Sequence, residues 1–170
     1  MEDILILVDP AVRPVGTASK SEAHRRGLLH RAFSVFLIRG DEMLIQQRQF
    51  GKYHSGGLWA NACCSHPRDG EVLADAVQRR MMEEIGLRCP VQEIGHFVYR
   101  SRYGEHLYEY EYDHVFLGDY QGEVPFNPEE ISEVRCSGLE ELAADLAANG
   151  QNYGSWFLTA APMVLEYLQK

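Results

Sequence analysis

The chain has 170 residues and 45% hydrophobic residues, which suits a single compact domain with a sizeable core, because single domains cluster near about 100–200 residues. Its formal net charge of −9 argues against a general nucleic-acid surface, although a few cations gathered in one pocket would still hold a small phosphate. The N-terminus lacks the features of a secretory signal, no apolar run approaches the about 20 residues of a membrane span, and two of the four cysteines are adjacent, so we expect a cytoplasmic protein without a membrane partner.

The first predicted elements follow an irregular segment. Residues 9–27 are rich in Pro, Gly, Ser and charge and show no sustained hydrophobic period, which predicts an irregular N-terminal arm. Two β-prone runs follow at 32–38 and 42–47. The Arg39-Gly40-Asp41 segment between them is typical of a tight turn, so we expect an antiparallel hairpin.

The next segment leads from a loop into a helix. Glycines and aromatic residues between 50 and 67 indicate a loop that enters a short strand ending at Cys64-Ser65-His66. Apolar residues from Val72 to Ile85 then recur at three- and four-residue steps, and Gly86 is suited to stop a helix. We therefore expect a helix over 72–85.

The remaining elements complete a mixed α/β (α+β) domain. Strands are predicted at 95–100 and at 107–117, the second because tyrosines alternate strictly with acidic residues. A further strand is expected at 131–136, an amphipathic helix at 139–148, and a closing helix at 162–168 with its proline in the first turn. The predicted architecture is a largely antiparallel or mixed sheet sandwiched between helices.

Two extended segments carry reactive side chains at a spacing of two residues. Cys64 and His66 would share one face of a strand, as would Glu109 and Glu111. A thiol, an imidazole and two carboxylates could therefore converge on one metal and one substrate. The neighbouring Cys63 would point to the opposite face, where we expect it to be buried and inert.

The helix predicted over 72–85 carries charged pairs one turn apart, Arg79 with Glu83 and Arg80 with Glu84. Alone, such pairs are surface ion pairs that contribute about 0.2–0.5 kcal/mol each. The longer pattern resembles the Nudix box, in which a loop and a helix present carboxylates to the divalent ion on a diphosphate. The resemblance spans residues 65–87 and rests on Glu71, Arg79, Met81, Glu83, Glu84, Gly86 and Leu87.

Two positions depart from that box. Ser65 stands where the box begins with glycine, and Arg80 stands where it has the first glutamate of its Arg-Glu pair. A fixed cation in place of a carboxylate removes a metal ligand and adds a partner for phosphate oxygens. We therefore expect this helix to hold a diphosphate rather than to cleave it.

A second resemblance accounts for these departures. From Lys20 to Trp156 the chain is similar to the type I isopentenyl-diphosphate isomerases, a branch of the Nudix superfamily. The motifs that carry the resemblance are His24, Leu29-His30-Arg31-Ala32-Phe33-Ser34, Trp59-Ala60-Asn61, Cys64-Ser65-His66-Pro67, Tyr99-Arg100 and Glu109-Tyr110-Glu111. The resemblance implies a Nudix-like fold, with an arm at 1–27 that contributes to the active site and a catalytic domain at 28–170. It also implies an isomerase of isoprenoid biosynthesis that interconverts isopentenyl and dimethylallyl diphosphate through a tertiary carbocation.

The resemblance assigns roles to individual residues. Cys64 and Glu111 would be the acid/base pair, in an order that stays open, while Tyr99 would hydrogen-bond the catalytic glutamate and the face of Trp156 would stabilise the cation. The implied diphosphate contacts are Lys20, Arg48, Lys52 and Arg80. One tightly bound Mn²⁺ or Zn²⁺ would be held by His24, His30, His66, Glu109 and Glu111. The Mg²⁺ that arrives with the diphosphate would be held by Glu84 and the backbone carbonyl of Cys64.

Four histidines match no motif and are expected to be surface or hydrogen-bonded structural residues: His54, His96, His106 and His114.

Two rival functions remain. One is a Nudix pyrophosphohydrolase, which Arg80 and the otherwise unused thiol of Cys64 disfavour. The other is a catalytically silent metal- or diphosphate-binding module. We expect a small isoprenoid diphosphate as the partner and no nucleic acid, with a monomer favoured over a dimer.

Overall fold

A nine-stranded mixed sheet forms the centre of the computed structural model, which describes residues 2–170. The central strand β3 (His30–Arg39) runs parallel to β8 (Tyr108–Asp119) and antiparallel to β4 (Glu42–Arg48) and β6 (Cys63–Ser65). The other strands are β1 (Ile4–Val8), β2 (Pro14–Ser19), β5 (Trp59–Asn61), β7 (Gln92–Arg102) and β9 (Ile131–Gly138). The predicted mixed sheet is confirmed.

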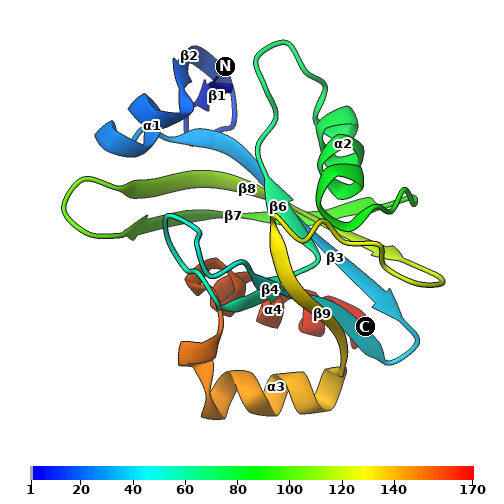
Figure 1. The fold of residues 1–170 in the computed structure, drawn as a ribbon. Helices are drawn as coiled ribbons and strands as arrows, with labels where there is room; N and C mark the ends of the chain where they lie inside the picture. The colour runs from blue at the N-terminus through cyan, green and yellow to red at the C-terminus, as the bar shows by residue number, and fades with distance from the viewer. Residues whose placement is uncertain (1) are drawn as a thin grey trace.

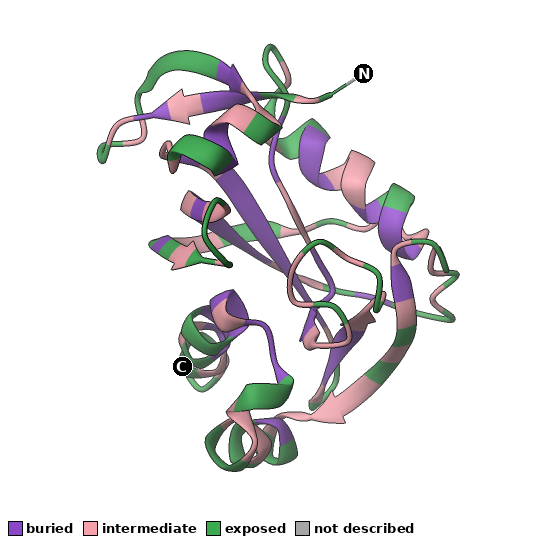
Figure 2. Cartoon of the chain, turned by 60° about the vertical axis from the view of Figure 1, so that its left-hand side comes forward, coloured by how far each residue is buried: buried purple, intermediate pink, exposed green. Residues whose placement is uncertain are grey.

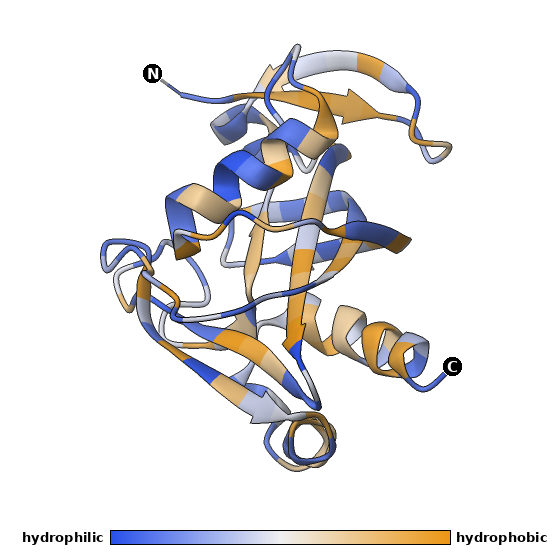
Figure 3. Cartoon of the chain, turned by 90° about the vertical axis from the view of Figure 1, so that its right-hand side faces the viewer, coloured by the Kyte–Doolittle hydropathy of each residue, from blue (hydrophilic) through white to orange (hydrophobic). Residues whose placement is uncertain are grey.

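Helices cover both faces of β3, which is buried along most of its length (Figure 2). Side chains of β3 alternate between two cores, with Phe33 packing toward α2 (Leu73–Ile85) and Phe36 toward α4 (Ser155–Leu168). Figure 1 shows α2 on one side of the sheet and α4 with α3 (Leu139–Ala148) on the other, and much of α4 is hydrophobic (Figure 3). Because each fully buried phenylalanine contributes about 1.5–3 kcal/mol, these two cores hold the sandwich together.

The helix α2 ends at the predicted residue for a specific steric reason. Gly86 has a φ of 66° and donates its backbone N–H to the carbonyl of Met82 at 3.2 Å. A Cβ added at Gly86 would lie 2.6 Å from the carbonyl oxygen of Pro125. Both the left-handed backbone and this close approach therefore require glycine.

We expect Gly86→Ala to lower the free energy of unfolding by about 2–3 kcal/mol, because it adds a backbone clash to the strain of a left-handed alanine. Gly122→Ala is the matched control, since Gly122 has a φ of 78° and no atom within 4 Å of an added Cβ. That control should lose only about 1 kcal/mol. Urea denaturation measures both, and equal losses would mean that the contact with Pro125 adds no cost.

The N-terminal segment is more ordered than its composition predicts. The strands β1 and β2 form an antiparallel hairpin at the edge of β3, and the helix α1 (Lys20–Arg26) follows. Ser19 caps α1 by accepting a hydrogen bond from the backbone of Glu22, and Gly27 ends it with a φ of 65°. The prediction of irregular structure over 9–27 is wrong, because such short elements are fixed by caps and by pairing with a distant strand rather than by a sustained period.

The last helix begins before its predicted start. The structure places Ser155 at the first turn of α4, so Pro162 lies inside the helix instead of opening it, whereas α3 covers the predicted range 139–148. An interior proline removes one helical hydrogen bond at a cost of about 3 kcal/mol. Burial of the apolar face offsets that cost through Phe157, Ala160, Ala161 and Val164. Of the helices within residues 2–170, none is long and apolar enough to cross a bilayer.

Candidate active site

A cavity of about 200 Å³ opens where the N-terminal helix, the central strands and α2 meet. Its lining brings together most of the predicted site residues: Lys20, His24, Arg48, Lys52, Cys64, His66, Arg80, Glu84, Glu109, Glu111 and Trp156. Two predicted residues, His30 and Tyr99, are buried just outside this lining. The cavity is also lined by residues that had been given no role in the site: Asp3, Phe33, Tyr53, His54, Ser65, Asp113 and Glu130.

The two adjacent cysteines of β6 face opposite ways. Cys63 is fully buried in the core beneath α2, as predicted, and its thiol donates a hydrogen bond to the carboxylate of Glu84 at 3.3 Å. Cys64 lines the cavity instead. Burial, followed by the nearby charge of Glu84, raises the pKa of Cys64 above its ordinary value. Cys64 therefore keeps its proton and is a potential acid.

The strand β8 lines the cavity with three carboxyl groups at alternate positions. Burial favours a raised pKa for Glu109, but hydrogen bonds from His54 and Glu111, together with the nearby imidazoles of His54 and His24, outweigh burial, so the pKa is lowered and Glu109 stays ionised. Burial and the charge of Glu109 raise the pKa of Glu111 well above its ordinary value. Burial also raises the pKa of Asp113 to about 8, although the hydroxyl of Ser34 donates to it at 2.9 Å. Alternate positions of this strand therefore differ in acidity: the pKa of Glu109 is lowered, whereas the pKa values of Glu111 and Asp113 are raised.

Three buried imidazoles lie beside this acidic strand in their neutral form. Burial lowers the pKa of His30 and His66 and lowers that of His24 to about 4. His30 lies opposite Glu111 in the pairing of β3 with β8, and its Nδ1 donates to the carbonyl of Leu28 at 3.0 Å. The Nε2 of His30 then carries a lone pair, lies 3.5 Å from Oε2 of Glu111, and has no hydrogen-bond partner within residues 2–170. Neutral imidazoles held in this way are suited to bind a divalent metal.

The predicted metal ligands approach one another without forming a closed cluster. His24 Nε2 lies 4.0 Å from Oε1 of Glu109, and the ring centre of His30 lies 5.5 Å from that of His24 and 6.0 Å from that of His66. Across residues 2–170, no three His, Cys, Asp or Glu side chains are gathered closely enough for a ready metal site. Lone pairs and carboxylate oxygens repel one another unless a cation or a proton lies between them. The mixed nitrogen and oxygen donor set therefore fits a divalent ion that would draw these side chains together.

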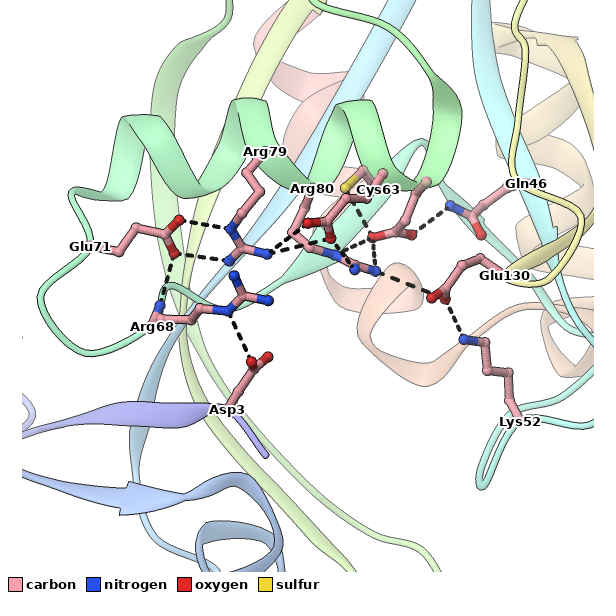
Figure 4. Close-up of polar contacts among 11 residues, drawn as sticks. Asp3, Gln46, Lys52, Cys63, Arg68, Glu71, Arg79, Arg80 and Glu130 are labelled. Carbon is pink, nitrogen blue, oxygen red and sulfur yellow. Dashed lines mark hydrogen bonds and ion pairs between the residues drawn. The ribbon is translucent and has the colours of Figure 1, made fainter. Parts of the chain in front are cut away.

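Two of the four predicted diphosphate contacts, Lys52 and Arg80, are held by carboxylates in this structure. Arg80 Nη2 lies 2.9 Å from Oε2 of Glu84 and 3.9 Å from Oε2 of Glu130, and Lys52 forms an ion pair with the same carboxylate of Glu130 (Figure 4). Burial raises the pKa of Glu84, and the charge of Arg80 opposes that rise. An arriving diphosphate would compete with Glu130 for both cations. No periodic pattern singles out Glu130, which follows an irregular segment.

Trp156 is oriented by a buried asparagine. Its indole N–H donates to Oδ1 of Asn61 at 3.2 Å, and the side-chain amide of Asn61 donates to the carbonyl of Cys63 at 2.8 Å. Asn61 thus links the indole of Trp156 by hydrogen bonds to β6, the strand that carries Cys64. The guanidinium of Arg48 lies 5.2 Å from the centre of the Trp156 ring, so one face of the ring already has a cation above it.

The hydroxyl of Tyr99 contacts different partners from those expected. It hydrogen-bonds the hydroxyl of Tyr103 at 2.6 Å and also that of Ser155. The backbone of Tyr99 pairs with Glu111 across β7 and β8, yet among the described residues its hydroxyl forms no hydrogen bond to Glu111. The expected hydrogen bond from Tyr99 to Glu111 is absent because the Tyr99 hydroxyl bonds to the hydroxyls of Tyr103 and Ser155 instead.

His54 is the site residue that sequence reasoning missed. It was expected to be a surface or hydrogen-bonded structural histidine; it is hydrogen-bonded, with Nε2 2.8 Å from Oε1 of Glu109, but it also lines the cavity. It lies in an irregular glycine-containing loop, where no period reveals which way a side chain points. Its position two residues after Lys52, a predicted diphosphate contact, was the one available hint. The other unmatched histidines lie outside the cavity lining: His96, His106 and His114.

Comparisons with known proteins agree with the resemblance seen in the sequence. Residues 28–157 match the family described as "NUDIX domain". A protein of Aromatoleum aromaticum named isopentenyl-diphosphate Delta-isomerase 2 is 44% identical over 166 residues, which cover 97% of this chain and 88% of the relative. The isopentenyl-diphosphate Delta-isomerase of Serratia proteamaculans is 41% identical over 160 residues, covering 94% of this chain and 89% of the relative. A crystal structure from Deinococcus radiodurans shares the fold, with a TM-score of 0.78 at 20% identity over 95% of this chain and 98% of that one.

Proposed function

The chain belongs to the Nudix family, in the group of isopentenyl-diphosphate Delta-isomerases, and we propose that it interconverts isopentenyl and dimethylallyl diphosphate through a tertiary carbocation. One observation carries this mechanism. Cys64 and Glu111 come from β6 and β8, which flank β3 on opposite sides, and both line one cavity that also holds a set of cations. This reaction is a step of isoprenoid biosynthesis.

The reaction moves a double bond by adding one proton and removing another. Protonation of the terminal alkene carbon leaves a cation at the tertiary carbon, and loss of a proton from the neighbouring methylene forms the new double bond. An acid and a base on opposite sides of the alkene can perform these two steps. Cys64 and Glu111 reach the cavity from strands on opposite edges of β3, which supports these roles, and the roles would exchange in the reverse direction.

The cation between the two steps needs a surface that stabilises charge without adding water. Trp156 supplies an aromatic face, and Asn61 fixes its orientation. A cation over such a face gains about 2 kcal/mol or more when it is desolvated. The guanidinium of Arg48 over the same ring supports this role, because the ring face accepts a cation there.

Two metal sites accompany this chemistry in the proposal. A tightly bound Mn²⁺ or Zn²⁺ would be held by His24, His30, His66, Glu109 and Glu111, and Mg²⁺ would be held by Glu84 and the backbone carbonyl of Cys64. When bound, the first ion would adjust the acidity of Glu111 and the second would neutralise diphosphate charge. The remaining diphosphate charge would be met by Lys20, Arg48, Lys52 and Arg80.

Proton NMR of the protein with isopentenyl diphosphate, Mg²⁺ and Mn²⁺ in D₂O tests this function. We expect deuterium to enter the substrate at its allylic positions while the signals of dimethylallyl diphosphate grow, because each turnover exchanges one proton with a protein group that equilibrates with solvent. Phosphorus NMR of the same sample should show no release of phosphate. Phosphate release without deuterium exchange would indicate a hydrolase, and unchanged spectra would indicate a silent binding module.

A further inference from the structure

One buried imidazole joins the loop between β4 and β5, residues 49–58, to the acidic strand β8. His54 Nε2 lies 2.8 Å from Oε1 of Glu109, its Nδ1 lies 2.9 Å from Oγ of Ser55, and its side chain is 6% exposed. An ionised carboxylate only accepts hydrogen bonds, so Nε2 donates to Glu109. Nδ1 then accepts from the hydroxyl of Ser55. This pairing of donors and acceptors satisfies both ring nitrogens and fixes the tautomer.

Aromatic neighbours hold the same ring independently of its hydrogen bonds. The ring of His54 stacks on Tyr103 with centres 4.1 Å apart and an interplanar angle of 9°. It also meets Tyr53 edge-on at 4.6 Å and Trp156 edge-on at 6.1 Å. Packing therefore sets the plane of the ring, while the hydrogen bond from Nε2 fixes the carboxylate of Glu109. The two contributions can be separated by substitution.

The loop that His54 anchors contains one of the four predicted diphosphate contacts, Lys52, and directly follows a second, Arg48. Arg48 immediately precedes the loop and donates from Nη2 to the backbone carbonyl of His54 at 3.3 Å, and Lys52 lies within the loop. The next residue, Ser55, has a φ of 55°, a left-handed conformation that is strained for a residue with a side chain. Such a conformation persists when surrounding contacts enforce it. The hydrogen bonds of His54 are contacts of this kind.

We propose that His54 is a positioning residue that couples the metal centre to the diphosphate-binding loop. Through its side chain it fixes Oε1 of Glu109 and so orients that carboxylate among the proposed metal ligands, and through its backbone it holds the guanidinium of Arg48. The inference rests on the proposed function, because that function assigns Glu109 to the metal and Arg48 to the diphosphate. Coupling of this kind is reciprocal, so metal binding should also order the loop.

Two substitutions separate packing from hydrogen bonding. His54→Phe keeps a ring to stack on Tyr103 and loses the N–H donor, whereas His54→Gln restores a donor. His96→Phe is the matched control, because His96 also stacks on a tyrosine, Tyr112, with centres 4.8 Å apart, and lies outside the cavity lining. We expect His54→Phe to raise the dissociation constant of Mn²⁺ by about 10-fold to 100-fold, as loss of an outer-shell partner does. His54→Gln should recover most of that loss, and His96→Phe should stay within about 2-fold of wild type.

The second readout is hydrogen–deuterium exchange of residues 49–58, followed with and without Mn²⁺ as the probe. Addition of Mn²⁺ should slow exchange across the loop in the wild-type protein and in His54→Gln, but not in His54→Phe. The KM for isopentenyl diphosphate should rise in His54→Phe more than kcat falls, because the loop binds the diphosphate. These readouts distinguish a positioning role from a purely structural one.

The wild-type measurement alone can overturn the proposal, since it needs no variant to fold. If Mn²⁺ leaves exchange of the loop unchanged in the wild-type protein, the coupling does not exist. The same conclusion follows if His54→Phe binds Mn²⁺ as tightly as wild type does. If the wild-type protein shows no isomerase activity while Mn²⁺ still orders the loop through His54, the proposed function fails and the coupling stands.

Discussion

Cys64→Ala is expected to lower kcat for isomerisation by about 10²–10⁴-fold or more, because it removes one member of the acid/base pair. The fold should be little changed, since a neutral thiol is lost without leaving a buried charge unpaired. Content of the tightly bound metal should stay the same, because the side chain of Cys64 is not among its proposed ligands. Kinetics by NMR, metal analysis and thermal unfolding measure these three properties. Near-normal turnover would show that the acid/base assignment is wrong.

Cys63→Ala provides a matched comparison at the neighbouring thiol. It removes a buried sulfur that donates to Glu84, so we expect a loss of stability of about 1–2 kcal/mol from the core. Its effect on kcat should be less than about 10-fold, because the thiol acts only through a carboxylate that Arg80 also holds. Equal losses of kcat in the two variants would contradict the assignment of the chemistry to Cys64.

Glu111→Gln should remove both turnover and most of the tightly held metal. The amide keeps the shape of the side chain but cannot take up a proton as a base or bind a divalent ion as strongly as a carboxylate. The substitution replaces one carboxylate oxygen by an NH₂ group in the side chain that lies 3.5 Å from Nε2 of His30. We expect kcat to fall by about 10²–10⁴-fold, and the increase in Tm that Mn²⁺ gives the wild-type protein should disappear. Unaltered metal stoichiometry would contradict the shared role of Glu111.

The metal-free proteins give this prediction a second test. Burial and the charge of Glu109 raise the pKa of Glu111 in the folded state. The folded protein therefore binds more protons than the unfolded chain above the ordinary glutamate pKa of about 4.3, so its stability falls as pH rises past that value. Glu111→Gln lacks this penalty and should be more stable than wild type by a margin that grows with pH. Glu105→Gln, whose parent side chain is 88% exposed, should show no such margin.

Local patterns in the sequence located elements that form their own periodic contacts. The three- and four-residue steps of 72–85 predicted α2, and the alternation of 107–117 predicted β8, because each helix or strand repeats its buried face over many residues. The arm and the start of α4 were missed. Their short helix, edge strands and interior proline depend on caps and on burial against distant segments.

The sequence by itself determined the family and the reactive residue types, since the spacing of Cys64 from His66 and of Glu109 from Glu111 is a property of the chain. Only the tertiary structure decided which side chains meet: His54 with Glu109, Trp156 with Asn61, and Glu130 with both Lys52 and Arg80. Each of these contacts joins segments that are separated by 50 or more residues. No local period encodes such a pairing, because it arises only when strands, helices and loops that are distant in the sequence pack around one cavity.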